Sequence, residues 1–144
     1  MRMALLDRSL YYKGLLLLAG RDRIIDPRER ELMLRFGKIL DFEKRFCEAA
    51  IDNLLNNRHL TAEPVVFSNP AIAECFLRDA LRLAFGDEEL HPKELTWLKA
   101  IVHANGLTDK WLDAEVQGYR EQKAQPVQPS PFSIENYLRE SGHG

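Results

Sequence analysis

One motif, which sets the helical organisation of the chain, occurs twice. Residues 19–29 read AGRDRIIDPRE and residues 84–94 read AFGDEELHPKE, with a constant offset of 65 residues. An alanine, an aspartate, a branched apolar residue, a proline and a glutamate recur in register. Each copy lies between two apolar segments that have the spacing of amphipathic helices. The sequence therefore predicts a duplicated unit of helix, acidic loop and helix.

Helical periodicity continues along the rest of the chain. Apolar residues recur at intervals of three and four, and no segment alternates long enough to predict a strand. We expect an all-α fold, a compact bundle of about six to seven helices with an internal pseudo-twofold repeat. The predicted helices start near Ser9, Pro27, Phe42, Pro70, Pro92, Asp109 and Ile134.

Several of these helices carry start or stop signals. Asn105-Gly106 predicts the end of the fifth helix, and Thr108 is expected to cap the sixth. Asp41 is expected to cap the third helix in the same way. The apolar residues that we expect on the inward face of the third helix are Phe42, Phe46, Ala49, Ala50 and Leu54.

The chain divides into two parts. Residues 1–124 are expected to form one helical domain, and residues 125–144 a Pro-rich linker followed by a short helix. In that helix Ile134, Tyr137 and Leu138 have the spacing i, i+3 and i+4. Because so short a helix is marginal alone, we expect these three residues to bind an apolar groove. The groove could belong to the same domain, to a second copy in a homodimer, or to a protein partner.

Composition limits the classes of function. The chain has 144 residues, 45% of them apolar, and a net charge of −2, which gives no field for binding nucleic acid. Cys47 and Cys75 fit no metal or redox spacing and are expected to be reduced, which indicates a cytoplasmic location. The apolar run 15–19 is too short to span a bilayer but leaves peripheral membrane contact at the inner face open.

The repeated motif has a purely structural interpretation. In the first copy Asp26 would cap a helix, Pro27 would be its first residue, and Glu29 would reach back toward the cap. In the second copy the corresponding residues are a histidine, Pro92 and Glu94. Every repeated residue is then explained without a ligand.

A second interpretation is a metal site. Asp22 to Glu29 and Asp87 to Glu94 each span seven residues, which matches the second half of a calcium-binding EF-hand loop. The turn glycine and the first two ligands of that loop are missing from both copies, so neither is an EF-hand. A weaker site for a divalent cation such as calcium or magnesium, shared between the two loops, stays open. The second copy is the better candidate because arginines crowd the first.

The paired motif Ala-x-x-Asp-x-x-(Ile/Leu)-x-Pro-x-Glu, with each copy between amphipathic helices, resembles the TerB-like family. That family includes tellurite-resistance TerB proteins and the N-terminal domain of DjlA-type co-chaperones. The resemblance covers about Ser9 to Tyr119 and lacks the family's usual glycine after the aspartate. It implies an all-helical bundle, an acidic metal site and a role in stress responses through complexes near the inner membrane. The metal ligands that it implies are Asp22, Glu29, Asp87 and Glu94.

No catalytic constellation is evident, because the serines and histidines lack the neighbours that nucleophilic or metal catalysis requires. We therefore expect no enzyme. The leading hypothesis is a TerB-like module that binds a protein partner in a stress- or envelope-associated complex, with weak divalent-metal binding at the acidic loops. One alternative is a DjlA-like regulatory or dimerisation domain of a co-chaperone. Another, from a different class, is a metal-dependent enzyme that uses the acidic loops.

Overall fold

The computed structural model describes residues 4–19, 27–56, 64–84, 92–122 and 133–141. Within these ranges the chain forms helices and no strand, which confirms the all-α prediction. The helices are α1 (Leu5–Ala19), α2 (Pro27–Ile39), α3 (Lys44–Asn56), α4 (Pro70–Ala84), α5 (Pro92–Ala104), α6 (Asp109–Gln122) and α7 (Ser133–Ser141).

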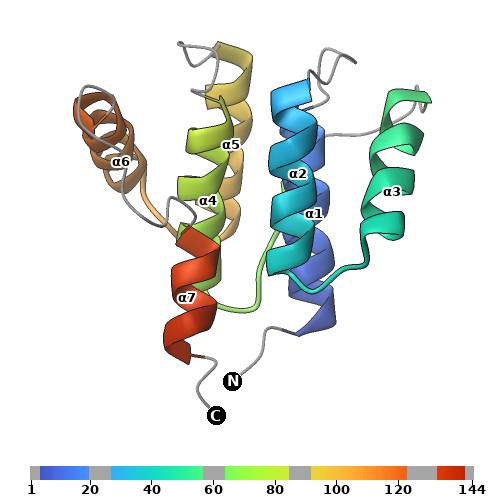
Figure 1. The fold of residues 1–144 in the computed structure, drawn as a ribbon. Coiled ribbons are helices and arrows are strands. Elements are labelled where there is room, and N and C mark those ends of the chain that lie inside the picture. Colours follow the sequence, from blue (N-terminus) through green and yellow to red (C-terminus); the bar gives the residue numbers. More distant parts are fainter. Residues whose placement is uncertain (1–3, 20–26, 57–63, 85–91, 123–132, 142–144) are drawn as a thin grey trace.

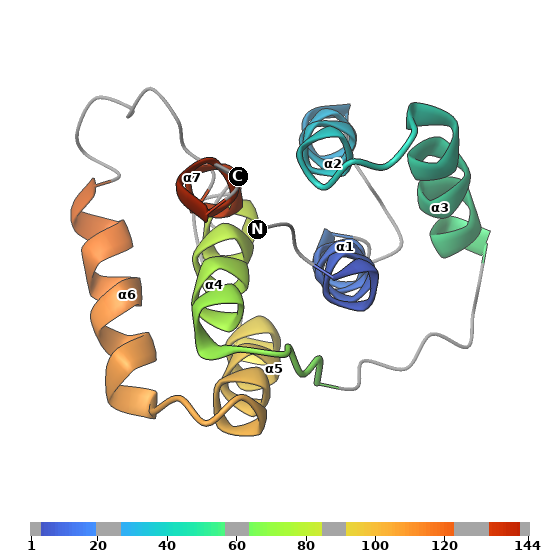
Figure 2. The same cartoon turned by 90° about the horizontal axis from the view of Figure 1, so that it is seen from below.

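Two helices lie next to each other in the middle of the molecule. These are α1 and α4, and they pack directly on one another (Figures 1 and 2). The pair α2 and α3 lies on the outer side of α1, while α5 and α6 lie around α4. Helix α7 packs on α4, and within the described residues no further short helix of this kind packs on the outer side of α1 (Figure 2). The extra helix therefore makes the two sides of the molecule different.

The helix starts repeat the offset of the sequence motif. We call residues 5–56 the first half and residues 70–122 the second half, and residues 65 apart counterparts. A descent of both halves from one repeated unit, related by a pseudo-twofold axis, stays a prediction. The pairs of helix starts that are counterparts are Leu5 and Pro70, Pro27 and Pro92, and Lys44 and Asp109.

Helix α5 ends at the predicted stop signal. Gly106 has φ of +76°, a left-handed conformation that costs a glycine little. Its amide donates to the His103 carbonyl oxygen at 3.2 Å, and the Leu107 amide donates to the Val102 carbonyl oxygen at 2.9 Å. This pair of bonds satisfies carbonyl groups that a helix end otherwise leaves free. Helix α6 then starts with the predicted cap, because the Trp111 amide donates to Thr108 Oγ1 at 3.1 Å.

The predicted role of Asp41 is wrong. It does not cap α3 but ends α2, with φ of +67° at the counterpart position of Gly106. The Phe42 amide donates to the Gly37 carbonyl oxygen at 2.8 Å, the same bond pattern that ends α5. Aspartate tolerates the left-handed conformation better than most residues. Helix α3 consequently starts two residues later than predicted, at Lys44.

The later start also changes which face of α3 is buried. Cys47 and Ile51 are inside, whereas Phe46 is 53% exposed and Ala49 is on the surface. Cys47 packs so closely on Gly37 that a Cβ there would lie 2.2 Å from Cys47 Sγ. The predicted face of α3 was therefore rotated relative to the observed one. Helix α1 likewise starts at Leu5, before the predicted Ser9.

Aromatic rings fill the space between α1 and α4. The counterparts Tyr11 and Phe76 meet edge to face with centroids 5.3 Å apart, and Phe67 packs on both at 5.8 and 5.4 Å. Phe67 belongs to the extended segment 64–69, which Asn105 holds. The Asn105 side chain accepts from the Phe67 amide and donates to the Val65 carbonyl oxygen, each at 2.8 Å. The core between the halves thus rests on a few large rings in fixed positions.

None of the helices within the described ranges is both long enough and apolar enough to cross a membrane.

Candidate helix-binding site on α4

The four predicted metal ligands are only partly described. Asp22 and Asp87 lie outside the described residues. Glu29 and Glu94 lie in the first turns of α2 and α5, at counterpart positions, and the Glu94 side chain is 4% exposed. Within the described part of the chain, no three His, Cys, Asp or Glu side chains are grouped so as to hold a metal ion. The shared metal site therefore stays a prediction.

The three residues predicted to bind a groove lie on the chain's own domain. Ile134 is completely buried, and Tyr137 and Leu138 pack half-buried against the main core. Helix α4 is the element that α7 contacts most extensively. The structure thus places the short helix in the first of the three expected settings, as an intramolecular occupant of α4.

A buried aspartate of α4 receives the start of α7. Asp79 Oδ1 accepts from the Ser133 amide at 2.7 Å, and Asp79 Oδ2 accepts from the Ile134 amide at 3.0 Å. The first amides of any helix lack acceptors within the helix itself. They also form the positive end of the helix dipole, which a carboxylate complements. Asp79 therefore caps α7 from another helix, across 54 residues of sequence.

Tyr11 of α1 fixes the direction of that carboxylate. Its hydroxyl donates to Asp79 Oδ2 at 2.5 Å, and both side chains are buried, with Asp79 only 1% exposed. Because the bond is charge-assisted, it is stronger than a neutral one. The carboxylate is thus held between α1 on one side and α7 on the other.

Burial changes the ionisation of this pair. Loss of hydration raises the pKa of Asp79 to about 6, although the bonds from Tyr11, Ile134 and Ser133 favour the charged form. Burial, together with the neighbouring Asp79, raises the pKa of Tyr11 well above its ordinary value. The carboxylate is therefore mostly ionised at neutral pH but titrates near pH 6, far above an exposed aspartate.

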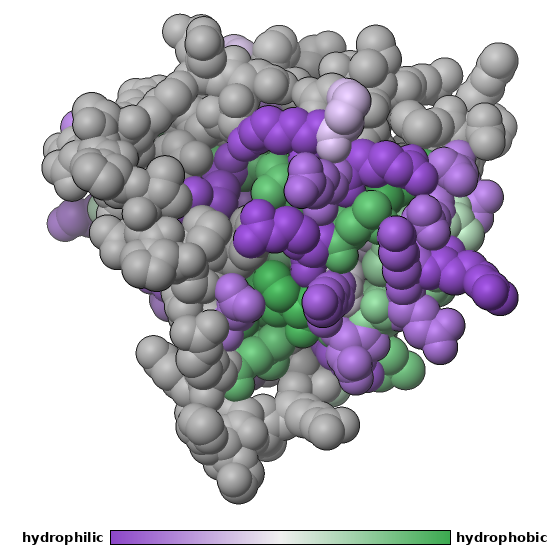
Figure 3. Space-filling view, in the orientation of Figure 1, coloured by the Kyte–Doolittle hydropathy of each residue, from purple (hydrophilic) through white to green (hydrophobic). Residues whose placement is uncertain are grey.

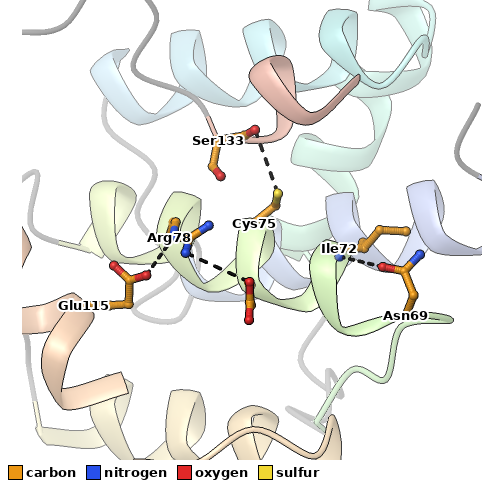
Figure 4. A network of polar contacts seen from close by, with 7 residues as sticks. Asn69, Ile72, Cys75, Arg78, Glu115 and Ser133 are labelled. Carbon is orange, nitrogen blue, oxygen red and sulfur yellow. Dashed lines mark hydrogen bonds and ion pairs between the residues drawn. The ribbon is translucent and has the colours of Figure 1, made fainter. Parts of the chain in front are cut away.

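A cysteine lines the same contact. Cys75 lies one turn before Asp79 on α4, and its Sγ is 3.9 Å from the Ser133 carbonyl oxygen (Figure 4). Burial raises the pKa of the Cys75 thiol, which keeps it protonated and unreactive. Cys47 and Cys75 are both buried and unpaired, as the sequence predicts.

The opposite edge of α4 is tied to α6. Arg78 Nε donates to Glu115 Oε1 at 2.8 Å (Figure 4). The guanidinium carbon of Arg78 also lies 5.7 Å from the centre of the Trp111 ring. These contacts are partly exposed and contribute little each. They nevertheless hold one side of α4 against α6, while the other side carries α7.

The first half lacks this site. The counterpart of Asp79 is Gly14 on α1, where a Cβ would lie 2.6 Å from Phe76 Cζ. Phe76 is itself the counterpart of Tyr11 and has no hydroxyl to donate. The tyrosine and aspartate of one side are thus replaced by phenylalanine and glycine on the other. The two differences match. With Gly14 in place of an aspartate, a tyrosine hydroxyl at position 76 would have no carboxylate to bond, and with Phe76 in place of a tyrosine, an aspartate at position 14 would have no hydroxyl donor.

A related contact holds the segment that precedes α4. Asp7 of α1 is buried, and its Oδ1 accepts from the Ser68 amide at 2.9 Å while its Oδ2 accepts from the Ser68 hydroxyl. Ser68 is the counterpart of Ser133. In each half, a buried aspartate of the first helix therefore binds the serine that follows the three-helix unit.

Sequence reasoning did not identify Asp79, although a signal was present. It lies on the apolar face of α4, between Phe76 and Leu83, where a charged residue is rarely buried without a partner. The sequence alone does not give that partner, because Tyr11 and Ser133 are distant along the chain. A charged residue within an apolar stripe is the pattern that could have found it.

The site combines a fixed acceptor for helix amides with an apolar surface, and it holds one amphipathic helix of the chain itself. Apolar surface also appears between hydrophilic side chains in the middle of the face in Figure 3. The chain matches no protein-family model, no curated protein and no solved structure. Function therefore has to be inferred from the geometry.

Proposed function

We propose that the chain is a non-enzymatic TerB-like binding module that holds an amphipathic helix of a protein partner on α4. The observation that carries the proposal is the helix that α4 already holds. Helix α7 is joined to the domain through the Pro-rich residues 123–132, and its buried Ile134 and capped amides meet a surface built by α4 and α1. A surface that accepts one such helix can accept another of similar pattern.

A stress- or envelope-associated role in the cytoplasm, as in TerB-like proteins, is part of this proposal. It rests on the paired motif around Pro27 and Pro92, both of which start helices at counterpart positions. The reduced state of the two buried cysteines agrees with a cytoplasmic location.

The test compares two baits, the unchanged chain and the variant Ile134→Asp. Burying a carboxylate at the Ile134 position is costly, so the variant releases α7 and leaves α4 open. We expect the open bait to recover a partner protein from native lysate that the unchanged chain recovers weakly. Amide shifts of α4 should then change on binding, while those of α3 stay constant. Recovery that is equal for both baits, or a footprint away from α4, would contradict the proposal.

A second candidate function is divalent-cation binding at the acidic loops. The observation that favours it is the burial of Glu94 at the start of α5, in the more acidic copy of the motif. We expect calcium, magnesium, manganese or zinc at millimolar concentration to shift the amide resonances near Asp22 and Asp87. If no ion moves those resonances, the metal hypothesis is wrong.

A further inference from the structure

We propose that the α4 surface selects its partner by the N-terminus of the incoming helix, which Asp79 reads, and that α7 is a built-in competitor for that surface. The inference rests on the proposed function and specifies its partner. The partner segment is an amphipathic helix that starts against Asp79. Its second residue is branched and apolar, and its fifth and sixth residues are apolar or aromatic, as in Ile134, Tyr137 and Leu138.

The geometry of the Asp79 carboxylate favours one end of a helix. Its two oxygens take different amides, Oδ1 from Ser133 and Oδ2 from Ile134, at 2.7 and 3.0 Å. Only the first residues of a helix present two neighbouring amides without acceptors. A segment lying along α4 in the middle of a longer helix would offer none. The contact therefore specifies where the bound helix must start.

The Asp79 carboxylate is held in place by a residue outside α7. Tyr11 comes from α1 and donates to Asp79 Oδ2 independently of α7. The acceptor is therefore oriented before a helix arrives, which lowers the cost of binding. Arg82, on the same helix as Asp79, favours the ionised form of this carboxylate.

Apolar residues of α7 contact the core directly after the capped amides. Ile134 is fully buried next to the capped amide, and one turn later Tyr137 and Leu138 pack on the core. The capped end fixes the register, so these apolar positions are read at fixed distances from it. A helix with the same residues in the opposite direction would present carbonyl groups to a carboxylate, which is unfavourable.

Helix α7 is short enough for a partner helix to displace it from α4. It has nine residues, too few for a stable isolated helix in water. Because α7 belongs to the same chain, its binding to α4 is intramolecular, which gives it a high effective concentration there. A partner helix therefore competes with α7. Its apparent affinity equals its intrinsic affinity multiplied by the fraction of chains whose α4 surface is free.

The experiment uses a synthetic peptide of residues 131–141, acetylated at its start and labelled with a fluorophore at its end. It is titrated into the full chain and into the full-length variant Ile134→Asp, both shown to be helical by circular dichroism. A second peptide carries an ester bond in place of the Ile134 amide, which removes one donor and keeps the shape. Each peptide is also titrated into the double variant Ile134→Asp with Asp79→Asn.

We expect the amide peptide to bind Ile134→Asp at least 10-fold more tightly than the unchanged chain. The ester peptide should bind Ile134→Asp about 10-fold or more weakly than the amide peptide, since hydrogen bonds to charged groups are the stronger ones. The same exchange should matter less than about 3-fold for the double variant, because its acceptor has lost the charge.

Equal binding of the two peptides to Ile134→Asp would overturn selection by the helix start and leave helix capture by α4 standing. Failure of both peptides to bind the folded Ile134→Asp chain would overturn the proposed function as well. A dimer of the unchanged chain that Ile134→Asp dissociates, seen by light scattering, would assign the surface to a second copy and overturn the partner helix.

Discussion

The first helices of the two halves hold counterpart places in the fold but carry different residues at positions 14 and 79. Helix α1 has Gly14 there, in contact with the ring of Phe76, and α4 has Asp79, bonded to Tyr11 and to the start of α7. The apolar pair, Gly14 and Phe76, packs the two halves together. The polar pair, Tyr11 and Asp79, also binds the start of α7. The bond to α7 therefore lies where the second half departs from the first.

The largest expected effect comes from giving the first half the aspartate of the second. Gly14→Asp places a side chain where a Cβ already lies 2.6 Å from Phe76 Cζ, and no helix start is present to bond its carboxylate. We expect the free energy of unfolding to fall by about 4 kcal/mol from overpacking and an unpaired buried polar group. Urea unfolding followed by circular dichroism measures it.

The matched control is Gly118→Asp on α6, where a Cβ meets no atom within 4 Å. It should change stability by less than about 1 kcal/mol. Similar losses for the two variants would mean that Gly14 is not needed for the close approach of α1 and α4.

Removal of the extra helix should have the next largest effect. A chain that ends at residue 124 loses the burial of Ile134 and leaves Asp79 without its amide donors. We expect the free energy of unfolding to fall by about 3 kcal/mol, because the apolar contact between α7 and α4 is lost and the surface of α4 becomes exposed. The melting temperature should fall, whereas a chain that lacks only residues 142–144 should melt like the full chain. An unchanged melting temperature for the shorter chain would show that α7 adds no stability.

The buried Asp79 should make the stability of the chain depend on pH. The folded-state pKa of Asp79, about 6, lies above the ordinary value of 3.8, so the folded chain holds this proton more tightly than the unfolded chain. The resulting stabilisation is complete below pH 3.8 and is lost as the pH rises through 6. Relative to Asp79→Asn, the unfolding free energy of the unchanged chain should fall by about 2 kcal/mol between pH 4.5 and pH 7.

Urea unfolding at a series of pH values measures both chains, and their difference removes the contribution of all other groups. A difference that does not vary with pH would contradict the burial of an ionisable Asp79. A difference that rises with pH would mean that its pKa is lowered.

The smallest effect is expected at the tyrosine. Tyr11→Phe gives the first half the phenylalanine that the second half has at the counterpart position, Phe76, and removes the donor that favours the charged carboxylate. The pKa of Asp79 should therefore rise further, which a carbon NMR titration of its carboxyl group detects. Tyr12→Phe is the control, because the Tyr12 hydroxyl donates to the Met33 carbonyl oxygen instead. A pKa of Asp79 that moves equally in both variants would exclude a specific role for Tyr11.

Local signals made much of the fold predictable. Pro27 and Pro92 start helices as expected, and Gly106 ends one, because each acts through its own backbone. Asp41 misled because an aspartate can cap a helix or end one, and only the observed φ distinguishes the two roles. The prediction of the inward face of α3 was wrong for the same reason, because it depended on the residue at which that helix starts.

The candidate site was predictable only in part. The spacing of Ile134, Tyr137 and Leu138 indicated a docking helix, but the periodicity of one helix carries no information about its partner surface. Asp79 was missed because its meaning depends on Tyr11, 68 positions away. The predicted metal ligands Asp22 and Asp87 lie outside the described residues, so the metal site stays a prediction.

An NMR pH titration can show whether the carboxylate of Asp79 holds the start of α7. Amide protons bonded to a carboxylate change their chemical shift when that carboxylate is protonated. We expect the amide protons of Ser133 and Ile134 to titrate together, with a midpoint near pH 6, and Asp79→Asn to abolish the transition. Shifts that stay constant from pH 4.5 to pH 7.5, or that survive Asp79→Asn, would contradict this role of Asp79.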